Sequence, residues 1–290
     1  MSKSYLDRLN EQIADKNSRV CVGLDPRYSR LPDGLRGEIE ELTDAPALRY
    51  AEGYRRFCRG ITEAVSPFAA AVKPQWAFFE AAGPAALGAL VDVVAHAREN
   101  DLLVIADAKR GDIGSTAEAY ARAFFGSDAP CPVDALTVNP YLGRDAVEPL
   151  VSAAAENGGL VYLLIKTSNP GSADLQDLIL EDGRPLWRAT AELARELAGE
   201  YPGAVGCVFG ATHPDDLRVA ADILEGLPLL LPGYGAQGAG AAELAPALTG
   251  SNLINSSRGI IFAHESSQLN WRQAAARAAM RMQEDLAGTA

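Results

Sequence analysis

The chain has 290 residues, of which 48% are hydrophobic and 22% charged, and its formal net charge is −12. This is an ordinary globular composition and excludes a disordered chain. The excess of acidic residues gives no general basic surface for binding the phosphate backbone of DNA or RNA. No apolar run is long enough to span a bilayer, and the first residues lack a signal-peptide core, so we expect a cytoplasmic protein without a membrane partner. The four cysteines form no C-x-x-C pair and are expected to be reduced thiols.

Helical and strand-like segments alternate along the chain, after an extra N-terminal helix expected at residues 1–18. Short apolar runs predict eight strands: Arg19–Asp25, Ala69–Lys73, Leu102–Ala108, Val133–Asn139, Leu160–Lys166, Ala204–Gly210, Pro228–Gly233 and Asn252–Ser256. Ala- and Leu-rich stretches between them predict helices, such as Ala85–Asn100, Arg144–Asn157, Leu186–Gly199 and Pro214–Glu225. Several strands are apolar on both faces, as in parallel sheets, and eight β-α units predict an α/β fold, the closed (β/α)8 TIM barrel.

We expect one domain over residues 1–290, because no repeat, low-complexity tract or linker divides the chain. Residues 1–18 would cover the barrel bottom, residues 19–262 would form the barrel core, and residues 263–290 would add a C-terminal helix. The stretch Arg27–Thr43 is expected to be a long first loop with Pro32-Asp33-Gly34 as a turn. A doubly wound open sheet is the alternative, but no glycine-rich dinucleotide fingerprint follows the first strand.

The third strand ends in Asp107-Ala108-Lys109-Arg110-Gly111-Asp112. Because side chains alternate along a strand, Asp107 and Lys109 are expected to point to the same face. Desolvating an ammonium group beside carboxylates is costly unless each charge has a partner, so this segment is a candidate for chemistry. The alternative is a surface salt bridge at a strand-to-helix turn, with Asp112 as the helix N-cap.

Other strand ends carry polar residues too, and in a TIM barrel the carboxyl ends of the strands form the active site. Asp25, Lys73, Asn139 and Ser168 stand at or just after the ends of strands one, two, four and five. Lys73 and Lys109 would alternate in sign with Asp107 around one small area. The opposite charges would stabilise each other and keep Lys109 protonated, as a general acid requires. Asp25 is expected to bind a hydroxyl group, with a turn before Pro26 as the alternative.

The loops after the last two strands are typical of a phosphate site. Gly233, Gly235 and Gly238 would let backbone N–H groups approach an anion closely, with Gln237 as a side-chain donor. Arg258, after the eighth strand, would add a forked, charge-assisted contact. The alternative is that the glycines only shape tight turns.

Taken together, these strand ends resemble the orotidine 5'-phosphate decarboxylase family, in its longer bacterial branch. The resemblance runs from Val22 to about Phe262, and its most specific part is Asp107-x-Lys109-x-x-Asp112-Ile113 with Lys73. Supporting segments are Pro232-Gly233-Tyr234-Gly235-Ala236-Gln237-Gly238, Ser257-Arg258-Gly259, Asn139-Pro140-Tyr141 and Lys166-Thr167-Ser168-Asn169. The resemblance implies decarboxylation of orotidine 5'-phosphate to uridine 5'-phosphate and CO2, the final step of de novo pyrimidine biosynthesis, without a metal or an organic cofactor.

The resemblance also implies roles for the residues around the reacting carbon. Asp25 and Lys73 would hold ribose hydroxyls, and Lys73 would also orient Asp107 against the substrate carboxylate. Lys109 would stabilise the carbanion at C6 and protonate it as CO2 leaves. Ser168 would contact the amide edge of the pyrimidine.

Further residues are implied to bind the nucleotide away from that carbon. Gln237 and Arg258 would bind the phosphate, beside Tyr234 and Gly235 on the same loop, and Asn139 is a further candidate on the rim. The enzyme would be a homodimer with shared sites, in which Asp112, Ile113 and Thr116 of each protomer reach into the partner's site.

Two other functions stay open. Sugar-phosphate decarboxylases and aldol-type synthases on a similar barrel share the D-x-K-x-x-D pattern but use Mg²⁺ and an acid at the end of strand two, where this chain has Lys73. The other is a catalytically silent phosphate- or nucleotide-binding barrel, which would be expected to lack a charged member of the set. No metal site is predicted, because no paired His or carboxylate spacing accompanies the three histidines, His96, His213 and His264.

Overall fold

The structure is a computed structural model that describes residues 3–126, 128–211, 214–235, 240–244 and 248–289. Within these residues, eight parallel strands follow one another around a closed barrel in which β8 pairs with β1. The predicted (β/α)8 TIM barrel is therefore confirmed, and each predicted strand overlaps its observed counterpart. The strands are β1 (Val20–Leu24), β2 (Ala71–Pro74), β3 (Leu103–Arg110), β4 (Ala135–Val138), β5 (Leu160–Lys166), β6 (Val205–Phe209), β7 (Leu229–Pro232) and β8 (Leu253–Ser256).

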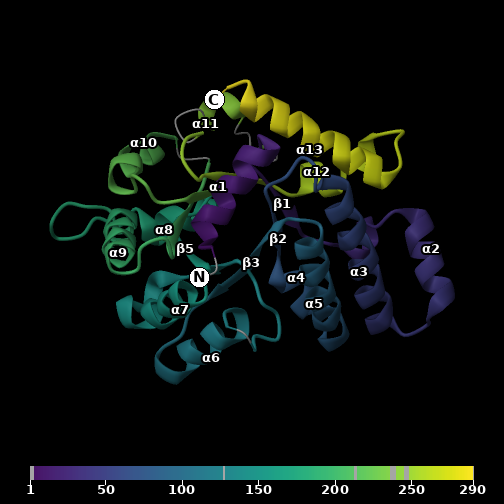
Figure 1. Cartoon of the computed structure of the whole chain (residues 1–290), viewed down its shortest axis with the longest axis horizontal. Helices are drawn as coiled ribbons and strands as arrows, with labels where there is room; N and C mark the ends of the chain where they lie inside the picture. The colour runs from purple at the N-terminus through teal and green to yellow at the C-terminus, as the bar shows by residue number, and fades with distance from the viewer. Residues whose placement is uncertain (1–2, 127, 212–213, 236–239, 245–247, 290) are drawn as a thin grey trace.

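Helices surround the barrel (Figure 1). The longer ones are α1 (Tyr5–Lys16), α2 (Asp33–Leu42), α3 (Pro46–Val65), α5 (Pro84–Glu99), α6 (Gly114–Phe124), α7 (Arg144–Glu156), α9 (Leu186–Glu200), α10 (Pro214–Ile223) and α13 (Trp271–Ala287). Short helices are α4 (Trp76–Ala81), α8 (Ala173–Gln176), α11 (Ala241–Leu244) and α12 (Arg258–Ile261), with 3-10 turns at Tyr28–Arg30, Pro140–Leu142, Pro170–Ser172 and Ala263–Ser266. Among the described helices, none combines the length and the apolar character that a membrane span needs.

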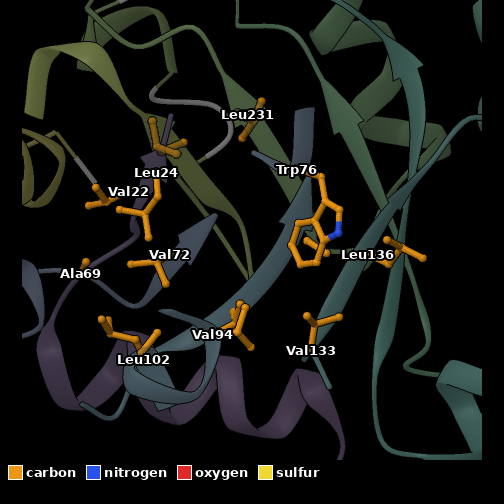
Figure 2. Packing of buried hydrophobic residues seen from close by; sticks show 14 of the residues in the cluster. Val22, Leu24, Ala69, Val72, Trp76, Val94, Leu102, Val133, Leu136 and Leu231 are labelled. Atoms are coloured by element: carbon orange, nitrogen blue, oxygen red, sulfur yellow. The ribbon is translucent and has the colours of Figure 1, made fainter. Parts of the chain in front are cut away.

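The strands separate two apolar layers, because successive side chains point to opposite faces. One layer lies between strands and helices, and Figure 2 shows it with Val22, Val72, Leu136 and Leu231 from four strands and Val94 from α5. The second layer fills the barrel interior with side chains that include Cys21, Ala71, Leu103, Ile105, Ala135, Leu160 and Tyr162. Both faces of the sheet are thus buried, as the apolar strand sequences predicted.

The predicted N-terminal helix is confirmed, and it packs against the amino-terminal end of the barrel. Tyr5 of α1 is fully buried with the interior layer, and its hydroxyl lies 3.1 Å from that of Tyr162. Lys16, at the other end of α1, donates to the carbonyl oxygens of Ala69 (3.2 Å) and Asp101 (2.6 Å), which precede β2 and β3. With the amino end covered, the carboxyl ends of the strands remain as the place for a site.

The prediction of a long first loop at Arg27–Thr43 is wrong, because most of this stretch is helical. A 3-10 turn covers Tyr28–Arg30, and α2 begins at Asp33 directly after Pro32. Leu35 and Ile39 lie one helical turn apart and are both buried in the core. Burial of this apolar stripe outweighs the turn signal of Pro32-Asp33-Gly34, including the low helix propensity of Gly34.

Candidate active site

The carboxylate of Asp107 lies at the centre of the candidate site, near the carboxyl end of β3. It is 6% exposed, and so is Lys73 at the end of β2, whose ammonium group donates to Oδ2 of Asp107. Gln75 donates to the same oxygen at 3.0 Å, and Nζ of Lys109 lies 2.5 Å from Oδ1. The alternative of a surface salt bridge does not hold for Asp107, whose carboxylate is buried, although its partner Lys109 in the same segment is 47% exposed.

The charges in this group support one another. Burial acts to raise the pKa of Asp107, but the ammonium groups of Lys73 and Lys109 outweigh it and hold that pKa well below its usual range. Burial acts to lower the pKa of Lys73, but Asp107 and then Asp25 outweigh it and raise that pKa above its usual value. We call Asp25, Lys73, Asp107 and Lys109 the charge array. Its central pair, Lys73 and Asp107, is fully ionised near neutral pH.

Asp107 and Lys109 meet through an irregular strand end. The register passes from Ala106 opposite Leu136 to Arg110 opposite Val138, so β3 advances four residues while β4 advances two. Lys109 has φ of 46°, in the left-handed region that non-glycine residues rarely occupy. The predicted proximity of Asp107 and Lys109 is confirmed, but the reason given for it, regular alternation along a strand, is wrong.

Asp25 occupies the end of β1 beside β8. Its Oδ2 accepts a 2.6 Å hydrogen bond from the hydroxyl of Ser257. Its Oδ1 is buried and has no hydrogen-bond partner among the described residues. An unpartnered buried carboxylate oxygen is costly, so this atom is suited to accept a hydrogen bond from a ligand hydroxyl.

Asn139 and Ser168 lie at neighbouring strand ends, and the described residues show no hydrogen bond from either to the charge array. Oδ1 of Asn139 accepts from the backbone N–H of Tyr141 at 3.1 Å and so caps the 3-10 turn that follows β4. Ser168 is half-buried beside the end of β6, where a Cβ on Gly210 would lie 2.9 Å from its backbone nitrogen. The absence of a side chain at Gly210 therefore allows the loop that carries Ser168 to pack closely.

The predicted phosphate loops are described in part. Gly233 and Gly235 have φ of 121° and 75°, so both adopt conformations that favour glycine. The hydroxyl of Tyr234, between them, donates to Asp285 of α13. Two predicted contributors lie outside the described residues: Gln237 and Gly238.

Arg258 is the first residue of α12, separated from β8 by Ser257 alone, and its side chain is exposed. Within the described ranges its guanidinium group makes no hydrogen bond or ion pair with another side chain. Most other arginines of this acidic chain have a carboxylate partner. An unpaired guanidinium at the carboxyl end of the barrel is available for an anionic ligand.

Asp112 does not join the charge array in the described structure. Its Oδ1 accepts from the backbone N–H of Ile113 at 2.8 Å, and the N-cap position of α6 belongs to Ile113. The alternative of Asp112 as the helix N-cap is therefore wrong. Ile113 is 56% exposed and Thr116 is exposed too, so these side chains face away from their own protein.

The described ranges contain no group of three or more His, Cys, Asp or Glu side chains arranged to hold a metal ion. Nε2 of His96 lies 3.0 Å from Glu63 on the outer helices, and His264 lies in a 3-10 turn after α12. His213 lies outside the described residues.

Sequence reasoning missed three residues that shape this site. Gln75 binds Asp107, Ser257 binds Asp25, and Thr137 of β4 donates to Oδ1 of Asp107 at 3.2 Å. Gln75 lies two residues after Lys73, and Ser257 belongs to the segment Ser257-Arg258-Gly259, but neither was given a role. Thr137 has no sequence signal, because an isolated threonine in an apolar strand is ordinary.

Comparison with known proteins finds one family to which this chain is similar. The model of the orotidine 5'-phosphate decarboxylase / HUMPS family matches residues 18–273. The orotidine 5'-phosphate decarboxylase of Rhodopirellula baltica is 41% identical over 98% of this chain and 99% of its own, and that of Roseiflexus castenholzii is 42% identical over 97% of this chain and 96% of its own. The solved structure of Leishmania donovani OMP decarboxylase has a TM-score of 0.76 and 33% identity, and the match covers 98% of this chain and 99% of that one.

Proposed function

The chain belongs to the orotidine 5'-phosphate decarboxylase / HUMPS family, and we infer from this membership and from the charge array that it is the decarboxylase. It converts orotidine 5'-phosphate to uridine 5'-phosphate and CO2 in pyrimidine biosynthesis, as a carboxy-lyase that needs no cofactor. The resemblance read from the strand ends is confirmed.

The buried Lys73–Asp107 pair is the observation that favours the decarboxylase over the Mg²⁺-dependent sugar-phosphate enzymes. The Mg²⁺-dependent sugar-phosphate enzymes on a similar barrel use an acid at the end of strand two. This chain places an ammonium group there, and its raised pKa keeps it charged. A positive charge at that position repels a divalent cation and favours the metal-free reaction.

Lys109 is the proposed acid of the reaction. Its side chain is 47% exposed, whereas that of Lys73 is 8% exposed, so Lys109 is the more accessible of the two ammonium groups to a substrate. When the bond from C6 to the carboxylate breaks, CO2 leaves and the electron pair stays on C6. The ammonium group of Lys109 stabilises that charge and then transfers a proton from Nζ to C6.

Asp107 and Asp25 have supporting roles in this proposal. Asp107 stays ionised and holds both lysines, and its position against the substrate carboxylate would raise the ground-state energy. Lys73 orients Asp107, and the unpartnered Oδ1 of Asp25 accepts a hydrogen bond from a ribose hydroxyl. Ser168 is proposed to contact the edge of the pyrimidine, and Asn139 to line the rim.

The phosphate is proposed to bind at the opposite side of the opening. Arg258 supplies a charged fork, and the loop through Gly233, Tyr234 and Gly235 supplies backbone N–H groups. Gln237 belongs to the same loop and is proposed as a side-chain donor. Binding energy from a phosphate remote from C6 contributes to the transition state when the loop closes over the substrate.

We propose that the enzyme is a homodimer with shared sites. Large apolar side chains are exposed beside the ends of β3 and β4, with Ile113 at 56%, Tyr141 at 73% and Leu142 at 49%. A cluster of such residues marks an interaction surface more often than a solvated one. From this surface Asp112, Ile113 and Thr116 would complete the partner's site.

Two finer points are proposals as well. We propose that residues 1–290 form one domain, because α1 packs into the barrel and Trp271 of α13 packs against Phe57 of α3. We propose a cytoplasmic enzyme, because all four cysteines are free and buried, which suits a reducing compartment.

A spectrophotometric assay tests the proposed function. Purified enzyme treated with a chelator is mixed with orotidine 5'-phosphate, and loss of the substrate's absorbance is followed. We expect turnover, with uridine 5'-phosphate as the nucleotide product. Absence of turnover, together with Mg²⁺-dependent activity on a sugar phosphate, would overturn the assignment in favour of the other branch of the family.

A further inference from the structure

Thr137 connects two strands at the irregular end of β3. It lies in β4 and is 2% exposed. Its hydroxyl oxygen accepts from the backbone N–H groups of Ala108 at 3.1 Å and Lys109 at 3.0 Å. The same oxygen lies 3.2 Å from Oδ1 of Asp107. One side chain therefore contacts three consecutive residues of the segment that carries the charge array.

The hydrogen bonds of this hydroxyl can be counted. A threonine hydroxyl has one proton to donate and two lone pairs. The two backbone N–H groups occupy both lone pairs, so the proton is left for an acceptor. Oδ1 of Asp107 at 3.2 Å is nearer than the carbonyl oxygen of Ala106 at 3.4 Å, and its negative charge makes it the stronger acceptor.

The carboxylate of Asp107 is also fully used. Oδ2 accepts from Lys73 and Gln75, and Oδ1 accepts from Lys109 and Thr137. Each carboxylate oxygen offers about two lone-pair sites, so four donors complete the set. A closed network of this kind fixes the orientation of the carboxylate, because rotation would break several bonds at once.

The backbone of Lys109 requires this support. Its φ of 46° is disfavoured for a side chain with a Cβ, and the register shift leaves the N–H groups of Ala108 and Lys109 outside the regular strand ladder. The hydroxyl of Thr137 replaces the acceptors that the ladder does not supply.

We propose that Thr137 is a positioning residue for the decarboxylation, an inference that rests on the proposed function. Its hydroxyl holds the irregular end of β3, which points the Lys109 ammonium group at Asp107. The same hydroxyl orients the Asp107 carboxylate toward that ammonium group. Thr137 acts through these two residues and has no contact with substrate in this proposal. Its loss would affect the chemical step more than substrate binding, because the phosphate and ribose contacts lie on other strands.

A pair of substitutions separates the hydroxyl from the shape of the side chain. Thr137→Val keeps the branched shape and removes the hydroxyl, whereas Thr137→Ser keeps the hydroxyl and removes a methyl group. Thr62→Val is the matched control, since Thr62 is fully buried in α3 and its hydroxyl donates to the carbonyl oxygen of Cys58 at 2.8 Å, away from the array. Steady-state kinetics with orotidine 5'-phosphate and the melting temperature are measured for all three and for the wild type.

We expect Thr137→Val to lower kcat by roughly tenfold to a hundredfold, the scale of an ångström-sized misplacement of a reacting group, with KM changed by less than about threefold. We expect Thr137→Ser to stay within about threefold of wild-type kcat, and Thr62→Val to keep full kcat even where its melting temperature falls with that of Thr137→Val. An unchanged kcat in Thr137→Val, or an equal loss in Thr137→Ser, would overturn the proposal.

The outcomes also distinguish this inference from the proposed function. An inactive wild type would contradict the function itself, whereas an active wild type with an equally active Thr137→Val would contradict only the role of Thr137. Thr137→Ala replaces the valine variant if that variant does not fold. If both hydroxyl-free variants fail to fold while Thr137→Ser folds, the hydroxyl is needed for folding and the positioning role is rejected.

Discussion

Replacing Asp107 by asparagine tests whether the charge array is a buried, mutually dependent set. The amide keeps the shape of the carboxylate and one oxygen that can accept hydrogen bonds. It removes the negative charge that Lys73 faces at a position where Lys73 is only 6% exposed. Asp25 is the remaining carboxylate that favours the charged form of Lys73. The substitution therefore leaves a buried ammonium group with most of its compensation gone.

The size of the effect follows from this burial. Breaking a buried ion pair by removing one partner costs about 3–5 kcal/mol of unfolding free energy. Lys73 limits the loss because it can release its proton, at about 1.4 kcal/mol per pH unit below a lysine's ordinary pKa of about 10.4. The ceiling is therefore about 4.6 kcal/mol at pH 7 and about 2 kcal/mol at pH 9. We expect Asp107→Asn to lose about 3–4.5 kcal/mol at pH 7 and at most about 2 kcal/mol at pH 9.

In the wild type the pair contributes equally at both pH values. Asp107 has a lowered pKa, so its contribution is present above the unfolded pKa of about 3.9 and is lost only as the pH falls through its folded pKa. Lys73 has a raised pKa, so its contribution is present below the unfolded pKa of about 10.4 and is lost only as the pH rises through its folded pKa. A deficit that shrinks between pH 7 and pH 9 therefore reports the neutralisation of Lys73 in the variant.

The assay is urea-induced unfolding at pH 7 and pH 9, at one protomer concentration, with linear extrapolation of the free energy. Asp33→Asn is the control, because Asp33 pairs with Arg36 on the surface and its side chain is 93% exposed. That variant should lose less than about 1 kcal/mol, with no trend in pH. A loss below about 1 kcal/mol at pH 7 in Asp107→Asn, or the same loss at both pH values, would refute the description of a buried, interdependent pair.

Four further outcomes are expected. Lys109→Ala should fold, since the side chain is half exposed, but lose decarboxylation, and normal turnover would remove Lys109 as the acid. Arg258→Ala should lower kcat/KM roughly tenfold to a hundredfold, the worth of a charge-assisted hydrogen bond, and an unchanged value would place the phosphate elsewhere. Mixing inactive Lys109→Ala and Asp112→Ala protomers should restore up to about a quarter of wild-type activity, because a hybrid dimer holds one intact shared site; no recovery after verified subunit exchange would contradict shared sites. Chelation should leave wild-type activity unchanged, whereas recovery that depends on added Mg²⁺ would favour the sugar-phosphate alternative.

Much of the fold was predictable because the signals are local. Runs such as Val161-Tyr162-Leu163-Leu164-Ile165 are apolar on both faces, which a strand needs only when both sides of its sheet are covered. The stretch at residues 27–43 was misread for the opposite reason. Pro32-Asp33-Gly34 is a local signal for a turn, but the helix there depends on burying Leu35 and Ile39 in the core, where α2 packs against α3.

The identity of the charged residues was likewise readable from the chain, since Lys73, Asp107 and Lys109 stand at strand ends and a parallel barrel brings such ends to one face. The atomic arrangement was not. Lys73 meets Asp107 because β2 and β3 are neighbours in the closed sheet, and Ser257 meets Asp25 because β8 closes onto β1. These contacts join residues far apart in sequence, so no local pattern encodes them.

The amino-acid sequence by itself determined the order of strands and helices and the set of ionisable groups that the barrel would gather. Only the tertiary structure decided that Asp107 is buried under four donors and that Lys109 adopts a left-handed backbone conformation. The physical reason is that the energy of each group depends on its neighbours. A charge is retained in the interior only where partners from other strands compensate for its lost hydration, and a strained backbone persists only where a group such as Thr137 satisfies the amides it exposes.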